Sequence, residues 1–409
     1  MTSLILNPAI LFCLVWGSTL FLYSLKYSEL LTDLEVRTVI LVVGSCLGAL
    51  AGWLFSRIFA RQLIVSPVRS ATPWANRTKA ILATRLRWFF FVWLALVLFE
   101  FASFGNLPFL SLLGIGAPVL YTEYGFSGLH GLLNAMQLAM FDMALIFYIR
   151  TGSRRYAFYA VALVVWSVLM VTRAMIMASI VQGIFIGLLF SASFRRRFML
   201  LGSSVVLAVV LAFGALGDLR SSGGSAIQDV GQQSSEYPDF LPAGFFWVYV
   251  YVTTPLNNIN ANIHSIPTTG FPYYSILPLI PNVLRDALAV EDLDVSLVEE
   301  SLNVSSFYRQ FLSDYGVYGT IFAVMLLYFA FSVAMAKSKR DELWSLVLVV
   351  ILFCTVLSVF VNAYTAIIYV MEMLVFKALY FRATPARRRL APASKPPTSR
   401  VAPVGAVNA

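Results

Sequence analysis

The apolar run at residues 156–190, YAFYAVALVVWSVLMVTRAMIMASIVQGIFIGLLF, contains a single charged side chain, Arg173. As one helix it would extend for about 52 Å, well beyond the roughly 30 Å hydrocarbon core of a bilayer. The run therefore predicts two membrane helices that turn near Arg173. Basic clusters flank the pair, RTGSRR at 150–155 and FRRR at 194–197, and such clusters mark cytoplasmic helix ends. We therefore expect Arg173 at the outer face.

Composition supports a membrane protein. The chain is 59% hydrophobic and 12% charged, whereas soluble domains carry about 25% charged residues. The net charge of +9 does not indicate nucleic-acid binding, because the charges are sorted by membrane side. Cys13, Cys46 and Cys354 lie in apolar stretches without C-x-x-C spacing, which argues against a disulfide framework and a zinc site. The N-terminus lacks a basic n-region and a cleavage site, which predicts a retained helix.

The sequence predicts an all-α polytopic fold with about ten transmembrane helices. The apolar stretches lie at roughly 4–25, 38–60, 88–105, 130–149, 156–172, 174–191, 199–216, 317–336, 344–361 and 363–381. Cytoplasmic termini place most of the 29 Lys and Arg residues inside. Residues 1–381 are thus expected to form one transmembrane domain. Residues 382–409, rich in Pro, Ala and basic residues, are expected to form a disordered cytoplasmic tail.

Two outer loops are too long to be simple turns. The first, at about 106–129, is apolar but punctuated by Gly and Pro, which suits a loop that dips into the interface. The second, at about 217–316, is acidic and contains FFWVYVYVTTPL and YYSILPLIPNVL, apolar pieces too short or too interrupted by proline to cross. Such pieces predict short interfacial helices. Because long loops are usually functional, we expect the activity at the outer face.

Four expected outer arginines carry the main chemical signal: Arg173, Arg220, Arg285 and Arg309. The chain has no H-E-x-x-H, G-x-S-x-G or G-x-x-x-x-G-K-[ST] motif, and SSGGS at 221–225 is typical of a flexible loop. Neither a metal nor a cofactor is therefore expected. Outer guanidinium groups suit an anionic, phosphate-bearing ligand. Pairing with the acidic residues of the loop is the alternative.

Three acidic residues, Glu100, Asp142 and Glu372, fall within predicted membrane spans. They could form a proton path, or they could pack against polar neighbours in the bundle. The two histidines, His130 and His264, suit structural roles better than catalytic ones.

Five blocks follow one another between about residues 120 and 335: YTEYGFSGLHGLLNA, VTRAMIMASIVQ, GDLRSSG, WVYVYVTTPLNN and NVSSFYRQFLSDYGVYG. In this order they resemble bacterial O-antigen polymerases of the Wzy type. The resemblance implies a membrane glycosyltransferase similar to the GT-C type in the bacterial inner membrane, with its active site facing the periplasm. It would transfer the growing glycan from undecaprenyl diphosphate onto a new undecaprenyl-diphosphate-linked repeat unit, without a metal. A chain-length regulator is an implied partner, together with membrane lipids.

The resemblance also implies roles for individual residues. Arg173 and Arg220 would stabilise the departing diphosphate, and Arg309 and Arg285 are further candidates. Glu123 in YTEYG is the first candidate for the general base. The other candidates for the base are Asp218, Asp314 and His264.

Three other functions remain open. Related O-antigen ligases carry a functional histidine where this chain has Ser305, which argues against a ligase. A flippase for lipid-linked oligosaccharides could use Glu100, Asp142 and Glu372 to couple ions, although we see no internal repeat of the kind common in transporters. A non-catalytic scaffold would leave the outer arginines unexplained.

Overall fold

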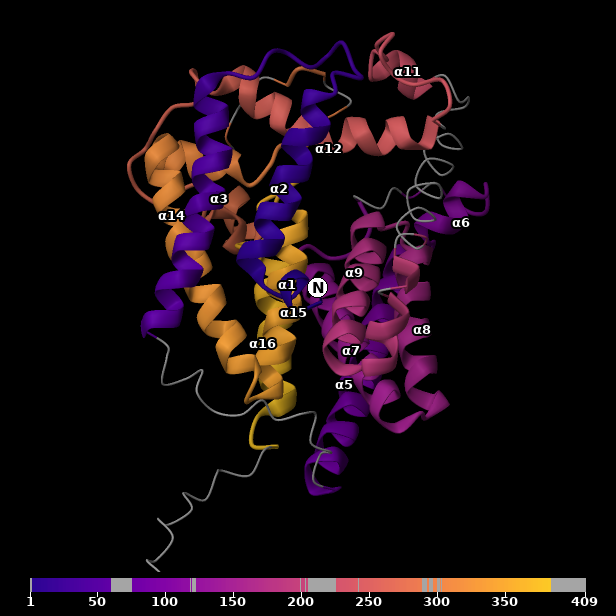
Figure 1. The fold of residues 1–409 in the computed structure, drawn as a ribbon. Coiled ribbons are helices and arrows are strands. Elements are labelled where there is room, and N and C mark those ends of the chain that lie inside the picture. Colours follow the sequence, from indigo (N-terminus) through magenta and orange to yellow (C-terminus); the bar gives the residue numbers. More distant parts are fainter. Residues whose placement is uncertain are drawn as a thin grey trace, which may run out of the picture.

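The computed structural model describes residues 2–59, 76–117, 119, 123–198, 200–202, 204, 226–241, 243–288, 293, 297–299, 302 and 304–383. Within these ranges the chain is helical and has no β-strand (Figure 1). Most of the predicted span 199–216 and of the tail lies outside them. The helices are α1 (Thr2–Ile5), α2 (Pro8–Ser24), α3 (Val36–Phe59), α5 (Asn76–Phe104), α6 (Pro108–Leu112), α7 (Leu129–Thr151), α8 (Arg154–Leu169), α9 (Arg173–Phe190), α11 (Ala226–Val230), α12 (Ala243–Asn262), η1 (Leu277–Leu279), α13 (Asn282–Ala287), α14 (Tyr308–Ser338), α15 (Glu342–Leu357) and α16 (Ile367–Tyr380).

The structure is that of an α-helical membrane protein. Helices α3, α5, α7, α9 and α14 are long and apolar enough to cross a bilayer, and α2 and α15 are shorter apolar helices of 17 and 16 residues. The total of ten spans stays a prediction.

The turn expected near Arg173 is present. α8 ends at Leu169 and α9 begins at Arg173. The Thr172 N–H donates to the Ser167 carbonyl (3.1 Å), and Val171 adopts a φ of 55°. Positive φ is rare for a β-branched residue, which shows how tightly the chain reverses. The long apolar run is therefore a helical hairpin, as its length predicted.

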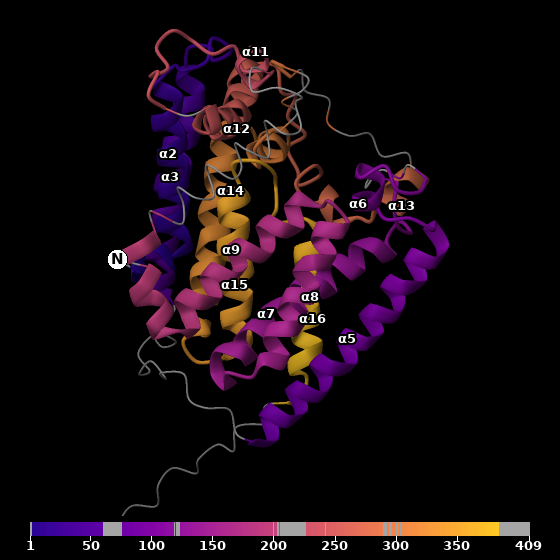
Figure 2. The same ribbon diagram turned by 90° about the vertical axis from the view of Figure 1, so that its right-hand side faces the viewer.

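The bundle has two hydrophobic clusters. One unites residues of α5, α7, α8, α9, α15 and α16, and the other unites residues of α2, α3, α12 and α14. α15 packs against α14 and α2 on one side and against α9 and α16 on the other, so it joins the two clusters (Figure 2).

The bundle also has two chemically different ends. At the end called here the basic end, Arg85 near the start of α5 donates to the Leu379 carbonyl near the end of α16 (2.8 Å). Arg150 near the end of α7 pairs there with Glu342 at the start of α15 (3.0 Å). The opposite end carries the longer connections and is called here the loop end.

Helix α12 lies across the loop end rather than along the bundle (Figure 1). We expected its sequence to form a short piece interrupted by proline, but it forms a continuous helix of 20 residues through Pro255. Its buried asparagines hold neighbouring loops. Asn257 accepts a hydrogen bond from the Tyr23 hydroxyl (2.6 Å), and the Asn258 amide donates to the Val304 carbonyl (2.9 Å). These contacts attach α12 to the bundle despite its transverse course.

Helix α14 is broken at Gly316, which adopts φ 65° and ψ −173°. This backbone conformation is essentially restricted to glycine. The expected membrane span, 317–336, begins directly after the break. The preceding residues, Tyr308–Tyr315, were expected in the outer loop but are helical. The break therefore separates a membrane segment from a short helix at the loop end.

Candidate functional site: an arginine-lined pocket

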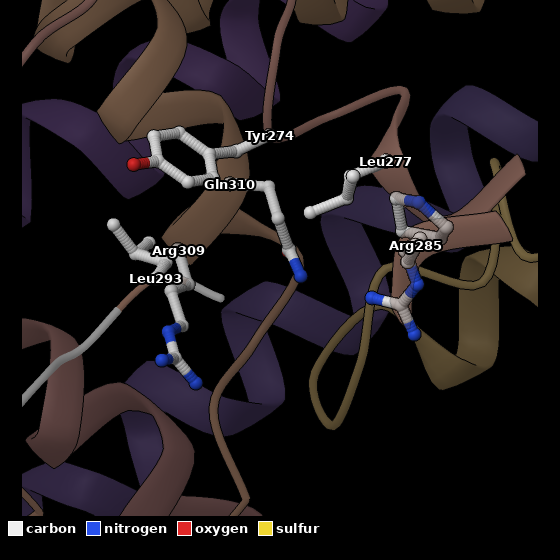
Figure 3. A pocket seen from close by; sticks show the side chains of 7 residues that line it. Tyr274, Leu277, Arg285, Leu293, Arg309 and Gln310 are labelled. Carbon is white, nitrogen blue, oxygen red and sulfur yellow. The ribbon is translucent and has the colours of Figure 1, made fainter. Parts of the chain in front are cut away.

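A pocket of about 270 Å³ lies at the loop end, beside the first turn of α14. It is lined by Tyr274, Leu277, Pro278, Arg285, Leu293, Arg309 and Gln310 (Figure 3). The lining combines the connection that contains η1, the short helix α13, Leu293 from the chain that follows α13, and the start of α14. Two of the four arginines singled out in the sequence, Arg285 and Arg309, therefore share one site.

The polar groups of the pocket point the same way. In Figure 3 the guanidinium groups of Arg285 and Arg309 and the amide of Gln310 project in a common direction, with Gln310 between the arginines. Both arginines are half-buried. Guanidinium groups bind phosphate oxygens through two parallel hydrogen bonds, and partial burial strengthens such contacts. The chemistry of this lining is that of an anion site.

The volume limits what this pocket can hold. Pockets for small organic ligands measure about 300–1,000 Å³. A pocket near the lower limit suits one phosphate or diphosphate group rather than an oligosaccharide. A larger ligand would place only its anionic group here.

Asp314 fixes the wall of the pocket. It is completely buried, and its two carboxylate oxygens accept hydrogen bonds from the backbone N–H groups of Tyr274 and Ser275, each at 2.7 Å. The Gly270 N–H donates to the Asp314 carbonyl (2.9 Å), and the Thr269 N–H donates to the Ser313 carbonyl (2.8 Å). Four backbone N–H groups are thus held by one turn of α14. Asp314, a sequence candidate for the general base, is placed where it positions Tyr274.

A second attachment comes from the connection between α15 and α16. The Asn362 amide donates to the Ser275 carbonyl (3.4 Å) and to the Thr365 hydroxyl (2.8 Å). η1 packs against α16. The segment at 269–279 is therefore a strap that runs from α14, in one hydrophobic cluster, to α16, in the other.

Glu123, the first candidate for the base, lies apart from the pocket lining. It is exposed, on the connection between α6 and α7. Burial raises the pKa of its neighbour Tyr124 to about 12, and the nearby Glu100 carboxylate adds to the rise. The Tyr124 phenol is therefore protonated at neutral pH, whereas Glu123 is an exposed carboxyl group on the described part of this connection.

Glu100 and His130 anchor this connection to the bundle. Glu100 is completely buried, accepts a hydrogen bond from the Phe126 N–H (3.1 Å) and lies 3.0 Å from His130 Nδ1. This is the structural role expected for His130. For Glu100, these contacts fit packing against polar neighbours rather than a proton path, the two roles that the sequence left open.

Two further candidates, His264 and Arg173, lie outside the pocket lining. His264 is exposed, with Nε2 3.5 Å from Glu35 Oε2. Arg173 is exposed on the first turn of α9. Asp218 and Arg220 lie outside the described residues.

Sequence reasoning missed Tyr274, Gln310 and Asn258. Tyr274 and Gln310 line the pocket. Asn258 orders the chain before α14, because its Oδ1 accepts from the Val298 N–H (3.0 Å) and its amide donates to Val304. The run TTPLNNINAN offered a signal, since so many amide and hydroxyl side chains in an apolar helix need partners. No comparable sequence pattern pointed to Tyr274 or Gln310.

Fold and pocket together define an α-helical membrane protein with a cationic pocket at one end of its bundle. No family model, no curated protein and no solved structure matches this chain.

Proposed function

We propose that this chain is a polymerase of lipid-linked oligosaccharide repeat units, similar to O-antigen polymerases of the Wzy type. The observation that carries the proposal is the convergence of Arg285 and Arg309 in one pocket at the loop end. The pocket has the charge and size for the diphosphate of an undecaprenyl-diphosphate-linked glycan. We place the basic end in the cytoplasm and the pocket at the periplasmic face of the bacterial inner membrane.

In the proposed reaction, a hydroxyl group of the acceptor repeat unit attacks the anomeric carbon of the donor glycan. The bond between that carbon and the diphosphate oxygen breaks, and undecaprenyl diphosphate leaves with both bonding electrons. Charge grows on the diphosphate as the bond breaks, so fixed guanidinium groups stabilise the transition state more than the ground state. Arg285 and Arg309 supply them here, whereas Arg173 and Arg220 have this role only by resemblance.

A base must accept the proton that the acceptor hydroxyl group loses. Glu123 remains the first candidate, because it is exposed on a loop-end connection. Both oxygens of Asp314 are already held by backbone N–H groups. His264 and Asp218 are the other candidates.

The test is binding of undecaprenyl diphosphate to purified protein, together with elongation of a lipid-linked repeat unit. We expect Arg285→Ala and Arg309→Ala each to weaken binding about 10- to 100-fold, since a hydrogen bond to a charged group contributes roughly 1.5–3 kcal/mol. Arg309→Lys should restore binding only in part, because lysine keeps the charge but lacks the planar fork.

Arg37→Ala is the matched control, since Arg37 is an exposed arginine on the first turn of α3 at the loop end. It should bind and elongate like the wild type. Wild-type binding in both pocket variants would refute the site. Movement of the lipid-linked glycan between leaflets without elongation would instead favour the flippase.

A further inference from the structure

Three polar side chains meet in the apolar interior, where α7 packs against both α9 and α16. They are Asp142, Gln182 and Glu372, each near the middle of its helix and each completely buried. The Gln182 amide donates to Glu372 Oε2 (3.2 Å). The Glu372 carboxylate also acts electrostatically on Asp142. These groups lie well away from the ends of the bundle and are not part of the arginine-lined pocket.

The cluster has acceptors but too few donors. Four buried oxygen atoms have no hydrogen-bond partner in the described part of the chain: both carboxylate oxygens of Asp142, Glu372 Oε1 and Gln182 Oε1. Neither acid belongs to a salt bridge among these residues. An ionised carboxylate is very costly in an apolar interior, and two neighbouring ones are worse. The cluster therefore calls for a species that donates to oxygen and carries positive charge.

We propose that Asp142, Gln182 and Glu372 form a cation site within the membrane bundle that holds an exchangeable proton. A hard metal cation takes about six to eight oxygen ligands, more than two carboxylates and one amide readily supply. No group of three or more His, Cys, Asp or Glu gathers in the described residues. A proton needs only one carboxylate and a nearby acceptor. Ionisable groups in membrane interiors commonly serve such proton transfer.

Besides Asp142, Glu372 acts electrostatically on two titratable groups, Cys354 of α15 and Tyr369 of α16. Both are neutral when protonated, so neither supplies a positive charge. Glu372 is the group that acts on Asp142, so we expect it to control proton binding at Asp142. This inference is independent of the proposed polymerase activity, because the site lies in the bundle interior.

The experiment uses dicyclohexylcarbodiimide, which modifies protonated carboxyl groups in apolar surroundings, on the purified full chain over a range of pH. Mass spectrometry locates the modified residue. We expect labelling at Glu372 or Asp142 that declines as the pH rises. Glu100 is the matched control, since it is equally buried but held by His130 and the Phe126 N–H, and it should stay near background.

A second measurement tests the electrostatic coupling between the two acids. Glu372→Gln removes the neighbouring negative charge, so labelling of Asp142 should disappear at a pH lower by about one unit or more. If this variant fails to fold, the infrared carbonyl band of protonated carboxyl groups in the wild type should disappear as the pH rises. Labelling or a band that is independent of pH would overturn the exchangeable proton in favour of a permanently neutral pair. Protection by sodium chloride but not by choline chloride would overturn the proton in favour of a metal ion.

Discussion

Asp314 accepts hydrogen bonds from two consecutive backbone N–H groups, so its charge and both its oxygens are used in holding the strap. Asp314→Asn turns one of these oxygens into an NH₂ group that faces an N–H donor. An unsatisfied buried donor costs about 1–3 kcal/mol. We expect a lower melting temperature and weaker diphosphate binding, because Tyr274 is no longer held at the pocket wall. Thermal unfolding and lipid binding measure both effects.

Asp33→Asn provides the control for Asp314→Asn. Asp33 is fully exposed and forms a surface ion pair with Lys26 (3.2 Å), so its loss should cost less than about 1 kcal/mol. If Asp314 were the general base, Asp314→Asn would stop turnover and leave stability and binding unchanged. That outcome would contradict the positioning role.

Individual residues were the hardest part to predict. The sequence drew attention to Arg285 and Arg309 as outer cations, but it gave them less weight than Arg173 and Arg220. They matter because the fold brings both to the lining of one pocket, and no local sequence pattern encodes that arrangement. Asp314 looked like a free acid for the same reason, since its donors lie about 40 residues earlier in the chain.

The close contact between helices α3 and α14 depends on glycines. A Cβ atom on Gly52 would lie 2.2 Å from the Met325 carbonyl oxygen and 2.8 Å from the Phe329 nitrogen, both of which are backbone atoms. Close helix packing of this kind commonly uses small residues four apart, and Gly44 and Gly48 continue the row. We expect Gly52→Ala to push the helices apart and to cost about 1–3 kcal/mol, as overpacking does.

Gly17→Ala is the matched substitution in α2, where a Cβ atom would meet nothing within 4 Å. It should leave thermal unfolding in detergent unchanged or slightly raise the melting temperature, because alanine favours helices. Equal melting temperatures for the two variants would show that α3 and α14 can separate without loss of stability.

Helices as units were predicted well. Hydropathy and the basic flanks identified the hairpin of α8 and α9, because a bilayer limits the length of a spanning helix. The transverse course of α12 was only partly predicted. Its attachment to the bundle uses buried asparagine contacts with residues that are distant in sequence. The helical Tyr308–Tyr315 was missed because it lies beyond the apolar run.

The arrangement of the whole molecule could not be read from its hydropathy. Each helix has an apolar surface, and nothing in a single sequence tells which surfaces meet. Contacts divide the helices into two clusters joined by α15, with the strap linking α14 to α16 at the loop end. The pocket lies beside this strap, so movement of one cluster against the other would change its shape.

The proposed function depends on the orientation of the protein in the membrane. The ends of α7 and α14 and the start of α8 are basic, which predicts that they face the cytoplasm. After replacement of the three native cysteines, Ser153→Cys and Ser338→Cys should be shielded from an impermeant thiol reagent in intact cells, while Arg173→Cys and the exposed Ser235→Cys should react. All four should react after the membrane is permeabilised, which controls for access within the fold. Reaction at Ser153→Cys together with shielding at Ser235→Cys would show that the protein has the opposite orientation in the membrane. The arginine-lined pocket would then face the cytoplasm, where a periplasmic polymerase could not use it.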